Sequence, residues 1–358
     1  MINNVKLRQS YLNFLLKATG KHSNSVLLIF ILLAITSCKE QKKPDVSHIK
    51  VDVKILRFEK DLYAGRNKIV EQMDSLLNRK YGVFYDDYVH RMVGDPTYNG
   101  TQILTTLYKD SAYTDLNSET QGVFKDMAQT EKDLSQAFKY IKYYYPKSRI
   151  PKFISFISGF SVQTPIGDDY MGIGLDMFLG KDSKFYKGIV QSVPTYISRR
   201  FSPEYIVPRI TETFAREELF HERDEDRTLL SKMIQNGKIL YFMDQVLDSG
   251  VPDSIKIGYT GKQIDWCKTY EQDIWGFFLE NDLLFETDYQ KIQVYLSEGP
   301  FTPGLGDKNE SAPKLGIWVG WQIVNKYMQE NKNITLQMLM TESDTQKLLT
   351  LSKYKPSH

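Results

Sequence analysis

The stretch that decides the fold is Met171-Gly172-Ile173-Gly174-Leu175-Asp176-Met177-Phe178, a short apolar run that contains two glycines. A run of this length between turn-forming residues is typical of a buried strand, because helices are usually longer. A second run of this kind, Phe153–Ile157, precedes it, and Gly159 and Gly167 lie in the segment that joins the two. Because glycine permits the turns that such a connection needs, we predict that the two strands pair in one sheet.

A helix is predicted after these strands, beginning at Ser202-Pro203-Glu204. Serine is a favoured N-cap residue and proline a favoured first helical residue. Ile206, Ile210 and Phe214 then recur at the spacing of one helical face. Glu217 continues this apolar stripe, which indicates either a buried polar cluster or a helix end that emerges into water.

The rest of the chain predicts a mostly helical α+β protein with a small sheet near its front. Residues 49–55 alternate between apolar and polar side chains, as expected for a half-buried strand. Apolar residues at helical spacing predict further helices over residues 69–77, 118–145, 226–247, 261–285, 315–329 and 335–339. Pro146 is expected to end the second of these helices, because proline has no backbone N–H to donate.

Residues 1–37 predict a bacterial lipoprotein signal peptide. A basic, acid-free leader precedes Val26–Ile35, an apolar run of ten residues that is too short to span a bilayer but typical of a signal-peptide core. The sequence Ile35-Thr36-Ser37-Cys38 resembles the lipobox, whose cysteine receives a lipid and becomes the first residue of the mature protein. We therefore expect Cys38 to anchor the protein in a membrane of the cell envelope, because two or three acyl chains hold a protein there stably.

From Cys38 onward we expect a polar tether over residues 38–47, followed by a single globular domain over residues 48–358. The composition, with 41% hydrophobic and 25% charged residues, is suited to a globular core. The tether is mostly basic, whereas known surface-export signals of Bacteroidetes lipoproteins are acidic, which favours a periplasm-facing protein. A net charge of +2 gives no support for nucleic-acid binding. Cys267 is the only other cysteine, so it has no disulfide partner once Cys38 is lipidated, and we expect it to be a small buried hydrophobe.

No constellation of catalytic residues stands out in the sequence. The zinc-peptidase motif H-E-x-x-H is absent, because no two histidines lie four residues apart. The nucleophile motif G-x-S-x-G and phosphate-binding glycine loops are absent as well. We therefore expect no metal, no cofactor and no catalytic site. The alternative is a hydrolase with paired carboxylates, in which Asp168 or Asp169 would act with Asp176.

Four tryptophans occur in two aromatic segments, Trp266 with Trp275 and Trp318 with Trp321. Core packing explains most residues of this kind. Because tryptophan is also a frequent anchor at interfaces, these four are candidates for a binding surface. A lipoprotein that binds cell-wall glycans through Trp318 and Trp321 is a further alternative, which exposed rings would support and packed rings would not.

Several motifs run through the mature chain. Besides the lipobox, they are Gly172–Gly180, Gly237–Phe242, Trp266–Trp275, Gly316–Val324 and Ser352–Pro356. Together they resemble the GldB family of gliding-motility lipoproteins of Bacteroidetes, and the resemblance covers nearly the whole mature chain. It implies a role in cell gliding, close to the type IX secretion machinery.

The same layout is similar to a family of predicted zinc peptidases of gluzincin type. Those proteins carry H-E-x-x-H on the helix after this strand and a third ligand, a glutamate, on the next helix. In this chain the H-E-x-x-H motif falls on Thr211–Ala215, and the third ligand falls on Gln235 or Asn236. Both histidines and the ligand glutamate are therefore replaced, and only the glutamate of the motif remains, as Glu212. The resemblance therefore implies a zincin-like layout, a small front sheet followed by a helical C-terminal half, without its metal motif.

These observations predict a non-catalytic periplasmic lipoprotein that acts by protein–protein contacts in the gliding or type IX secretion apparatus. Its expected partners are the membrane, through the lipid on Cys38, and other proteins of that machinery.

Overall fold

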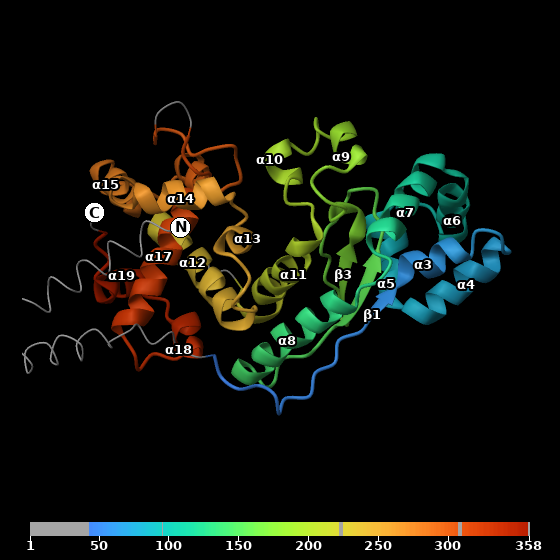
Figure 1. Cartoon of the computed structure of the whole chain (residues 1–358), viewed down its shortest axis with the longest axis horizontal. Helices are drawn as coiled ribbons and strands as arrows, with labels where there is room; N and C mark the ends of the chain where they lie inside the picture. The colour runs from blue at the N-terminus through green and yellow to red at the C-terminus, as the bar shows by residue number, and fades with distance from the viewer. Residues whose placement is uncertain (1–42, 95, 222–224, 307–309, 357–358) are drawn as a thin grey trace, which may run out of the picture. The chain divides into compact units, whose positions relative to one another are not determined.

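Helices surround a small sheet, which confirms the predicted α+β class with mostly helical content (Figure 1). The computed structural model describes residues 43–94, 96–221, 225–306 and 310–356. The predicted signal peptide, residues 1–37, and the predicted lipidation site, Cys38, lie outside the described residues. The described residues from Val46 onward form one compact unit.

The sheet has three parallel strands in the order β1 (Ile55–Arg57), β2 (Lys152–Phe156) and β3 (Tyr170–Gly174). The predicted pairing of the two apolar runs is confirmed as the pairing of β2 with β3, in which Phe153 lies opposite Met171. The run that decides the fold is a strand only as far as Gly174, after which the chain forms a short 3-10 helix, η2 (Leu175–Met177).

The connection between β2 and β3 packs along the free edge of β3. Gly172 donates its backbone N–H to the carbonyl of Pro165 at 2.8 Å, and Gly174 donates to the carbonyl of Gln163 at 2.8 Å. A Cβ atom at Gly174 would lie 2.5 Å from the carbonyl oxygen of Val162. Glycine is therefore required here by close backbone approach rather than by a turn.

The helices of the N-terminal part precede β2. They are α3 (Phe58–Ala64), α4 (Val70–Tyr81), α5 (Val83–Asp87), the π-helical η1 (Tyr88–Met92), α6 (Gly100–Lys109), α7 (Ser111–Val123) and α8 (Ala128–Tyr144). The predicted helix over 69–77 is confirmed as α4. The predicted helix over 118–145 is divided into α7 and α8, because Phe124 and Met127 are buried in a break between them. Pro146 follows the end of α8, as predicted.

Aromatic side chains cover both faces of the sheet. Phe153 of β2 contacts Phe138 of α8, with 5.1 Å between ring centroids. Phe156, which points to the opposite face because side chains alternate along a strand, contacts Phe84 of α5 at 5.6 Å. The sheet is thus enclosed between α3–α5 on one face and α8 on the other (Figure 1).

The predicted strand over 49–55 is wrong in its bounds, because β1 begins only at Ile55. Val51, Val53 and Ile55 are buried and Ile49 is half-buried, and these residues alternate with exposed ones, as the pattern predicts. Their backbone amides, however, bind side chains of α8: Val53 donates to Ser135 Oγ at 2.8 Å, and Ile55 donates to Glu131 Oε1 at 2.9 Å. Residues 49–54 are therefore not part of the sheet, although Val53 and Ile55 are bound to α8.

The C-terminal part is helical. Its elements are α9 (Lys184–Gly188), α10 (Thr195–Ser198), η3 (Pro203–Tyr205), α11 (Ile206–Phe214), the π-helical η4 (Ala215–Leu219), α12 (Leu229–Val246), α13 (Asp253–Ile257), α14 (Gly261–Thr269), α15 (Glu271–Glu280), η5 (Leu283–Phe285), α16 (Tyr289–Ile292), η6 (Gln293–Tyr295), α17 (Leu315–Glu330), α18 (Leu336–Thr341) and α19 (Thr345–Ser352). The helices predicted over 226–247, 315–329 and 335–339 are confirmed as α12, α17 and α18. The one predicted over 261–285 is divided, because Tyr270 separates α14 from α15 and Asp282, with φ 53°, precedes η5.

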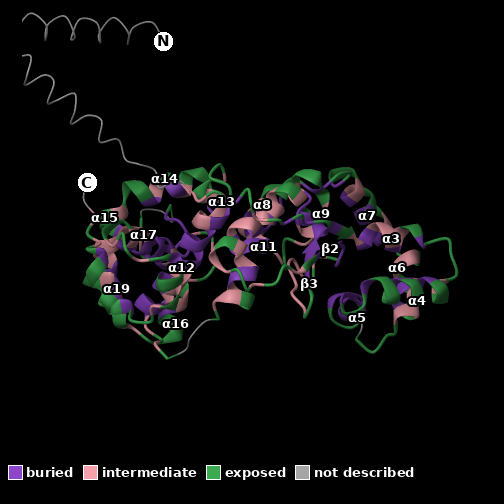
Figure 2. Cartoon of the chain, turned by 90° about the horizontal axis from the view of Figure 1, so that it is seen from below, coloured by how far each residue is buried: buried purple, intermediate pink, exposed green. Residues whose placement is uncertain are grey.

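Two glycines allow α12 and α17 to touch backbone to backbone. A Cβ atom at Gly237 of α12 would lie 2.3 Å from the carbonyl oxygen of Gly320, and one at Gly320 of α17 would lie 1.9 Å from that of Met233. These contacts explain why a glycine lies inside α12, where it costs helix propensity. The crossing forms the centre of the C-terminal part, where buried residues gather (Figure 2).

Candidate functional site

An arginine joins α11 to α12. Arg216, in the π-helical turn η4 that follows α11, donates from Nε to Glu212 Oε1 at 3.0 Å and from Nη2 to Asn236 Oδ1 of α12 at 2.9 Å. Arg209 donates from Nη1 to the other oxygen of Glu212 at 2.7 Å. We call Glu212, Arg216 and Asn236 the Arg216 bridge. π-helical turns are rare and often occur at functional sites.

The apolar stripe of α11 orients this bridge. The three residues of the stripe are buried as predicted, so Glu212 and Arg216, one turn apart, lie on another face of the helix. Ser202 precedes the helix as predicted, but its Oγ accepts the backbone N–H of Lys181 at 3.1 Å instead of capping the first turn. Glu217 is exposed, and of its two interpretations the helix end in water is therefore correct.

The surrounding cations hold Glu212 ionised. Burial alone would raise the pKa of Glu212, but Arg209, Arg216 and Lys314 lower it to about 2. The carboxylate is only 19% exposed, so its attraction to these cations is weakly screened by water. The space between Glu212 and Asn236 is thus occupied by a charge-paired guanidinium.

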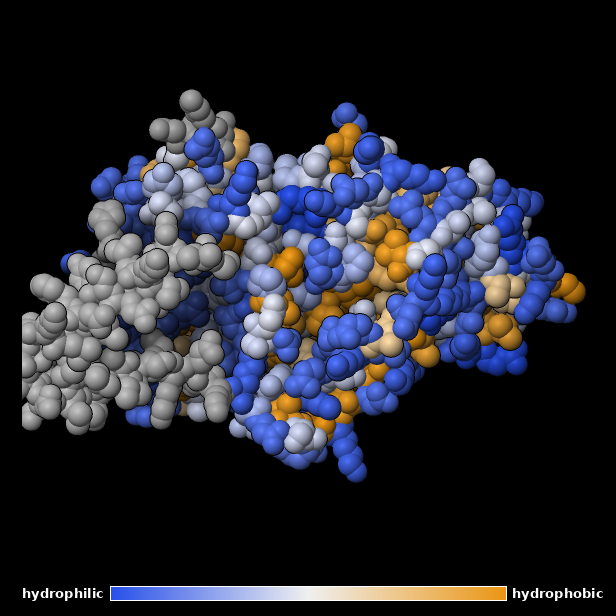
Figure 3. Space-filling view, viewed as in Figure 1, coloured by the Kyte–Doolittle hydropathy of each residue, from blue (hydrophilic) through white to orange (hydrophobic). Residues whose placement is uncertain are grey.

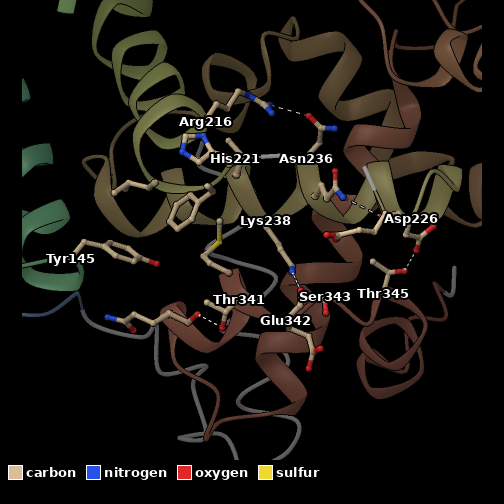
Figure 4. A pocket seen from close by; sticks show the side chains of 18 residues that line it. Tyr145, Arg216, His221, Asp226, Asn236, Lys238, Thr341, Glu342, Ser343 and Thr345 are labelled. Atoms are coloured by element: carbon tan, nitrogen blue, oxygen red, sulfur yellow. Dashed lines mark hydrogen bonds between the residues drawn. The ribbon is translucent and has the colours of Figure 1, made fainter. Parts of the chain in front are cut away.

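The Arg216 bridge separates two pockets, because Arg216 and Asn236 line both of them. The first, which we call the polar pocket, measures about 670 Å³ and is lined by residues of α12, α18 and α19 (Figure 4). The second, which we call the basic pocket, measures about 460 Å³ and is lined by residues of α10, α11, α12, α13 and α17.

Polar groups of the polar pocket join α12 to the C-terminal segment. Lys238 Nζ donates to the backbone carbonyl of Glu342, and Thr345 donates to Asp226 at 3.1 Å. Tyr145 enters from the side opposite Thr345 (Figure 4). These contacts bind Lys238 and Asp226 to groups of the C-terminal segment.

Cationic side chains dominate the basic pocket. They are Arg200, Arg209, Arg216, Lys256 and Lys314. Two carboxylates, Glu212 and Glu298, also line it, and each is shared by two of the cations. Glu298 Oε1 accepts from Arg200 Nη1 at 2.8 Å and from Lys314 Nζ at 2.5 Å. The pocket therefore holds two clusters, each with two cations around one carboxylate, and each cluster carries one positive charge in excess.

Local backbone geometry positions the second cluster. Gly258 has φ +78°, and a Cβ atom there would lie 2.6 Å from Arg200 Nη1. Lys314 precedes α17 and is buried, so burial lowers its pKa, Glu298 partly opposes this and Arg200 lowers it further. Lys256 is compensated separately, by Asp244 at 2.6 Å and Asp253 at 3.0 Å.

The sequence of this chain matches, over residues 39–356, a family described as Gliding motility protein GldB. The chain belongs to the GldB family. This membership confirms the resemblance drawn from its motifs, and the family name marks its members as lipoproteins. No curated protein and no solved structure matches this GldB chain. None of its described helices has both the length and the apolar composition that crossing a bilayer requires.

The positions that the zinc-peptidase layout assigns to the metal come together only in part in this GldB chain. Glu212 and Asn236 are both bound to Arg216. Gln235 instead points to the polar pocket and lines that pocket but not the basic one. Thr211 and Ala215, at the two histidine positions, are buried. Among the described residues no three His, Cys, Asp or Glu side chains cluster closely enough to hold a metal ion.

The predicted tryptophan surface is wrong for two of its four members. Trp318 and Trp321 are 2% and 3% exposed, and Trp321 Nε1 donates to Asp244 at 2.9 Å. Both rings pack in the core as part of α17, so they are not available to a glycan. Trp266 and Trp275 are half-buried, and a binding role for them stays a prediction.

The predicted carboxylate pair is not formed, because its members lie at opposite ends of β3. Asp168 and Asp169 precede the strand and are exposed. Asp176 follows the strand, is fully buried, and accepts the backbone N–H groups of Phe160 at 2.6 Å and Ser158 at 3.2 Å. Burial raises the pKa of Asp176, and these amides oppose the rise. The role of Asp176 is therefore to order the loop after β2.

Sequence reasoning missed the basic pocket. Its cations are spread from Arg200 to Lys314 without a common spacing, and each one resembles an ordinary surface residue. A glycine at the C-terminal end of α13, Gly258, is the one local feature that could have indicated a close approach there. Cys267 is buried, as predicted.

Proposed function

We propose that this chain is a membrane-anchored, non-catalytic lipoprotein of the gliding apparatus, which acts in the periplasm through contacts with other gliding or secretion proteins. Membership of the GldB family supports the link to gliding. The lipobox that ends at Cys38 and the mostly basic tether after it support an anchored protein that faces the periplasm. The Arg216 bridge carries the non-catalytic part of the proposal.

A guanidinium between Glu212 and Asn236 disfavours a metal cation at that place. Arg216 brings a permanent positive charge to within 3.0 Å of both acceptors, and Arg209 adds a second one. A divalent ion would be repelled by both arginines, and it would have to displace charge-assisted hydrogen bonds, which are the strong ones. This arrangement supports a site whose role is structural or binding.

Metal content and peptidase activity test the non-catalytic part. We expect the purified lipoprotein, equilibrated with zinc and then dialysed, to retain less than one zinc per chain and to leave a panel of peptides uncleaved. Arg216→Gln is the matched variant, because it removes the charge and keeps a hydrogen-bonding side chain. One tightly held zinc per wild-type chain, or a peptidase activity that Glu212→Gln abolishes, would overturn the proposal.

Gliding itself tests the biological part. We expect a strain that lacks this gene to lose gliding and to regain it when the wild-type gene is restored. A deletion strain that glides normally would contradict the assignment to the gliding apparatus.

A further inference from the structure

We propose that the basic pocket binds an acidic peptide segment of a partner protein, with a carboxylate of that segment placed between the two cation clusters. This inference rests on the proposed function, because it names the chemistry of a partner that the protein would meet by contact. The charge of the pocket, its apolar wall and its size each support it.

Each cation cluster can accept a further anion. In the first cluster, Arg209 and Arg216 share the single carboxylate of Glu212, and their side chains remain 39% and 37% exposed. An arginine side chain has five N–H donors. Within the described part of the chain, the hydrogen bonds of Arg209 go only to Glu212, so the guanidinium retains donors for a ligand.

The cations of the second cluster are more buried than those of the first. Arg200 and Lys314 share Glu298, and both side chains are nearly buried. Gly258 leaves the space that the Arg200 guanidinium occupies. A ligand would therefore meet cations that are already held in place, so that little side-chain entropy is lost on binding.

Apolar side chains form much of the remaining wall. They include Ile197, Phe201, Leu240, Ile255, Leu296 and Ile317. Hydrophobic residues also lie between hydrophilic ones in the middle of the face shown in Figure 3. An inorganic anion would leave this wall in contact with water. A peptide in which an apolar residue neighbours Asp or Glu would cover the wall and neutralise the excess charge at once.

The size of the pocket and the geometry of its ion pairs agree with a peptide carboxylate. A volume of about 460 Å³ is within the range of ligand sites and holds a few side chains. The cation pairs of the pocket already bind two carboxylates, at distances from 2.5 to 3.0 Å. Planar guanidinium groups suit carboxylate oxygens in particular.

A peptide-binding measurement tests this inference on the detergent-solubilised, full-length lipoprotein. The probe is a fluorescent peptide of alternating leucine and glutamate, and its reference is the same peptide with glutamine in place of glutamate. We expect the acidic peptide alone to bind, more weakly as salt is added. Arg209→Gln should weaken binding by about tenfold or more, because hydrogen bonds between charged groups are worth that much.

Arg79→Gln is the matched control, because Arg79 is exposed on α4 and the substitution changes the net charge equally. It should leave peptide binding unchanged. Glu212→Gln should strengthen binding, because it removes a competing carboxylate, and circular dichroism would verify that each variant is folded. Equal binding of the acidic and amide peptides, or equal loss in Arg79→Gln, would overturn the inference.

Competing ligands distinguish an acidic peptide from the other anions that the pocket could bind. Inorganic phosphate or phosphatidylglycerol vesicles that displace the peptide at lower concentration than unlabelled peptide does would overturn the assignment to a peptide. In cells, an Arg209→Gln strain that glides and keeps its wild-type crosslinks to partners would also overturn it. That last result would leave the proposed function intact, whereas stoichiometric zinc would contradict the proposed function and leave the peptide measurement unchanged.

Discussion

At the scale of single residues, the low pKa of Glu212 links the Arg216 bridge to the stability of the fold. The pKa of about 2 is below the ordinary value of 4.5, since two arginines and Lys314 outweigh the effect of burial. A carboxyl group whose pKa is lower in the folded than in the unfolded chain stabilises the fold once it is ionised in both states. Its contribution is therefore complete above about pH 4.5 and is lost as the pH falls towards 2.

We predict that Glu212→Gln flattens the pH dependence of stability between pH 4.5 and 2. The wild-type contribution that disappears across this window is on the order of 3 kcal/mol, from the size of the shift. Urea unfolding at several pH values, followed by tryptophan fluorescence, measures it.

Glu217→Gln is the matched control for this measurement, because Glu217 lies in the next turn and is exposed. It should leave the slope of stability against pH as in the wild type. Parallel slopes for the wild type and Glu212→Gln would show that the ionisation of Glu212 contributes nothing to stability.

The roles of single residues could be predicted where they depend on hydrophobicity alone. Cys267 and the stripe of α11 are buried as expected. Asp176 could not be predicted, because its charge is compensated by backbone amides of a loop 16 to 18 residues earlier. Trp318 and Trp321 were ambiguous for a related reason, since tryptophan serves both cores and interfaces.

At the scale of elements, the crossing of α12 and α17 depends on glycine. We predict that Gly320→Ala destabilises the protein by about 1–3 kcal/mol or more, because the new Cβ atom would lie 1.9 Å from the backbone oxygen of Met233. Backbone cannot rotate away as a side chain does, so the helices would have to separate. The free energy of unfolding in urea measures the effect.

Gly276→Ala gives the opposite sign and serves as the matched control. Gly276 lies inside α15, and the nearest atom to a Cβ there is Glu280 Oε1 at 3.9 Å. We predict a gain of about 0.5–1 kcal/mol, because alanine restricts the unfolded chain more than glycine does. A destabilised Gly276→Ala together with an unaffected Gly320→Ala would contradict this account of the crossing.

The existence of the main elements could be predicted, whereas some of their bounds could not. Periodicity identified α4, α11, α12, α17 and two strands. It did not reveal that Ser135 and Glu131 bind the backbone of Val53 and Ile55, because those partners lie about 80 residues away in the sequence. The breaks near Phe124 and Tyr270 were missed for the same reason, since tertiary packing overrides a continuous helical pattern.

At the scale of the whole molecule, family membership could be predicted, whereas the basic pocket could not. The motifs that indicate the GldB family are local stretches, and the chain carries them in order. The basic pocket unites residues from helices and loops between Gln163 and Ile317, and their proximity exists only in the folded chain.

The proposed membrane anchor gives a prediction for the molecule as a whole. We predict that Cys38→Ala moves the protein from the membrane to the soluble fraction, because acyl chains on that cysteine supply the binding energy. Fractionation of cells and mass spectrometry of the N-terminal peptide measure this. Cys267→Ala is the control and should stay with the membrane, since Cys267 is buried. An unmodified Cys38, or a Cys38→Ala protein that is equally membrane-bound, would refute the anchor.

The way in which β1 is held has a mechanical consequence for a tethered protein. Any tension along the tether would enter the domain through the residues just before β1. Two α8 side chains hold the chain at Val53 and at Ile55, the first residue of β1, and β1 itself pairs with β2 in parallel register. With the proposed anchor at Cys38, a pull on β1 would have to break bonds of both kinds, and this attachment would oppose load transmitted from the membrane.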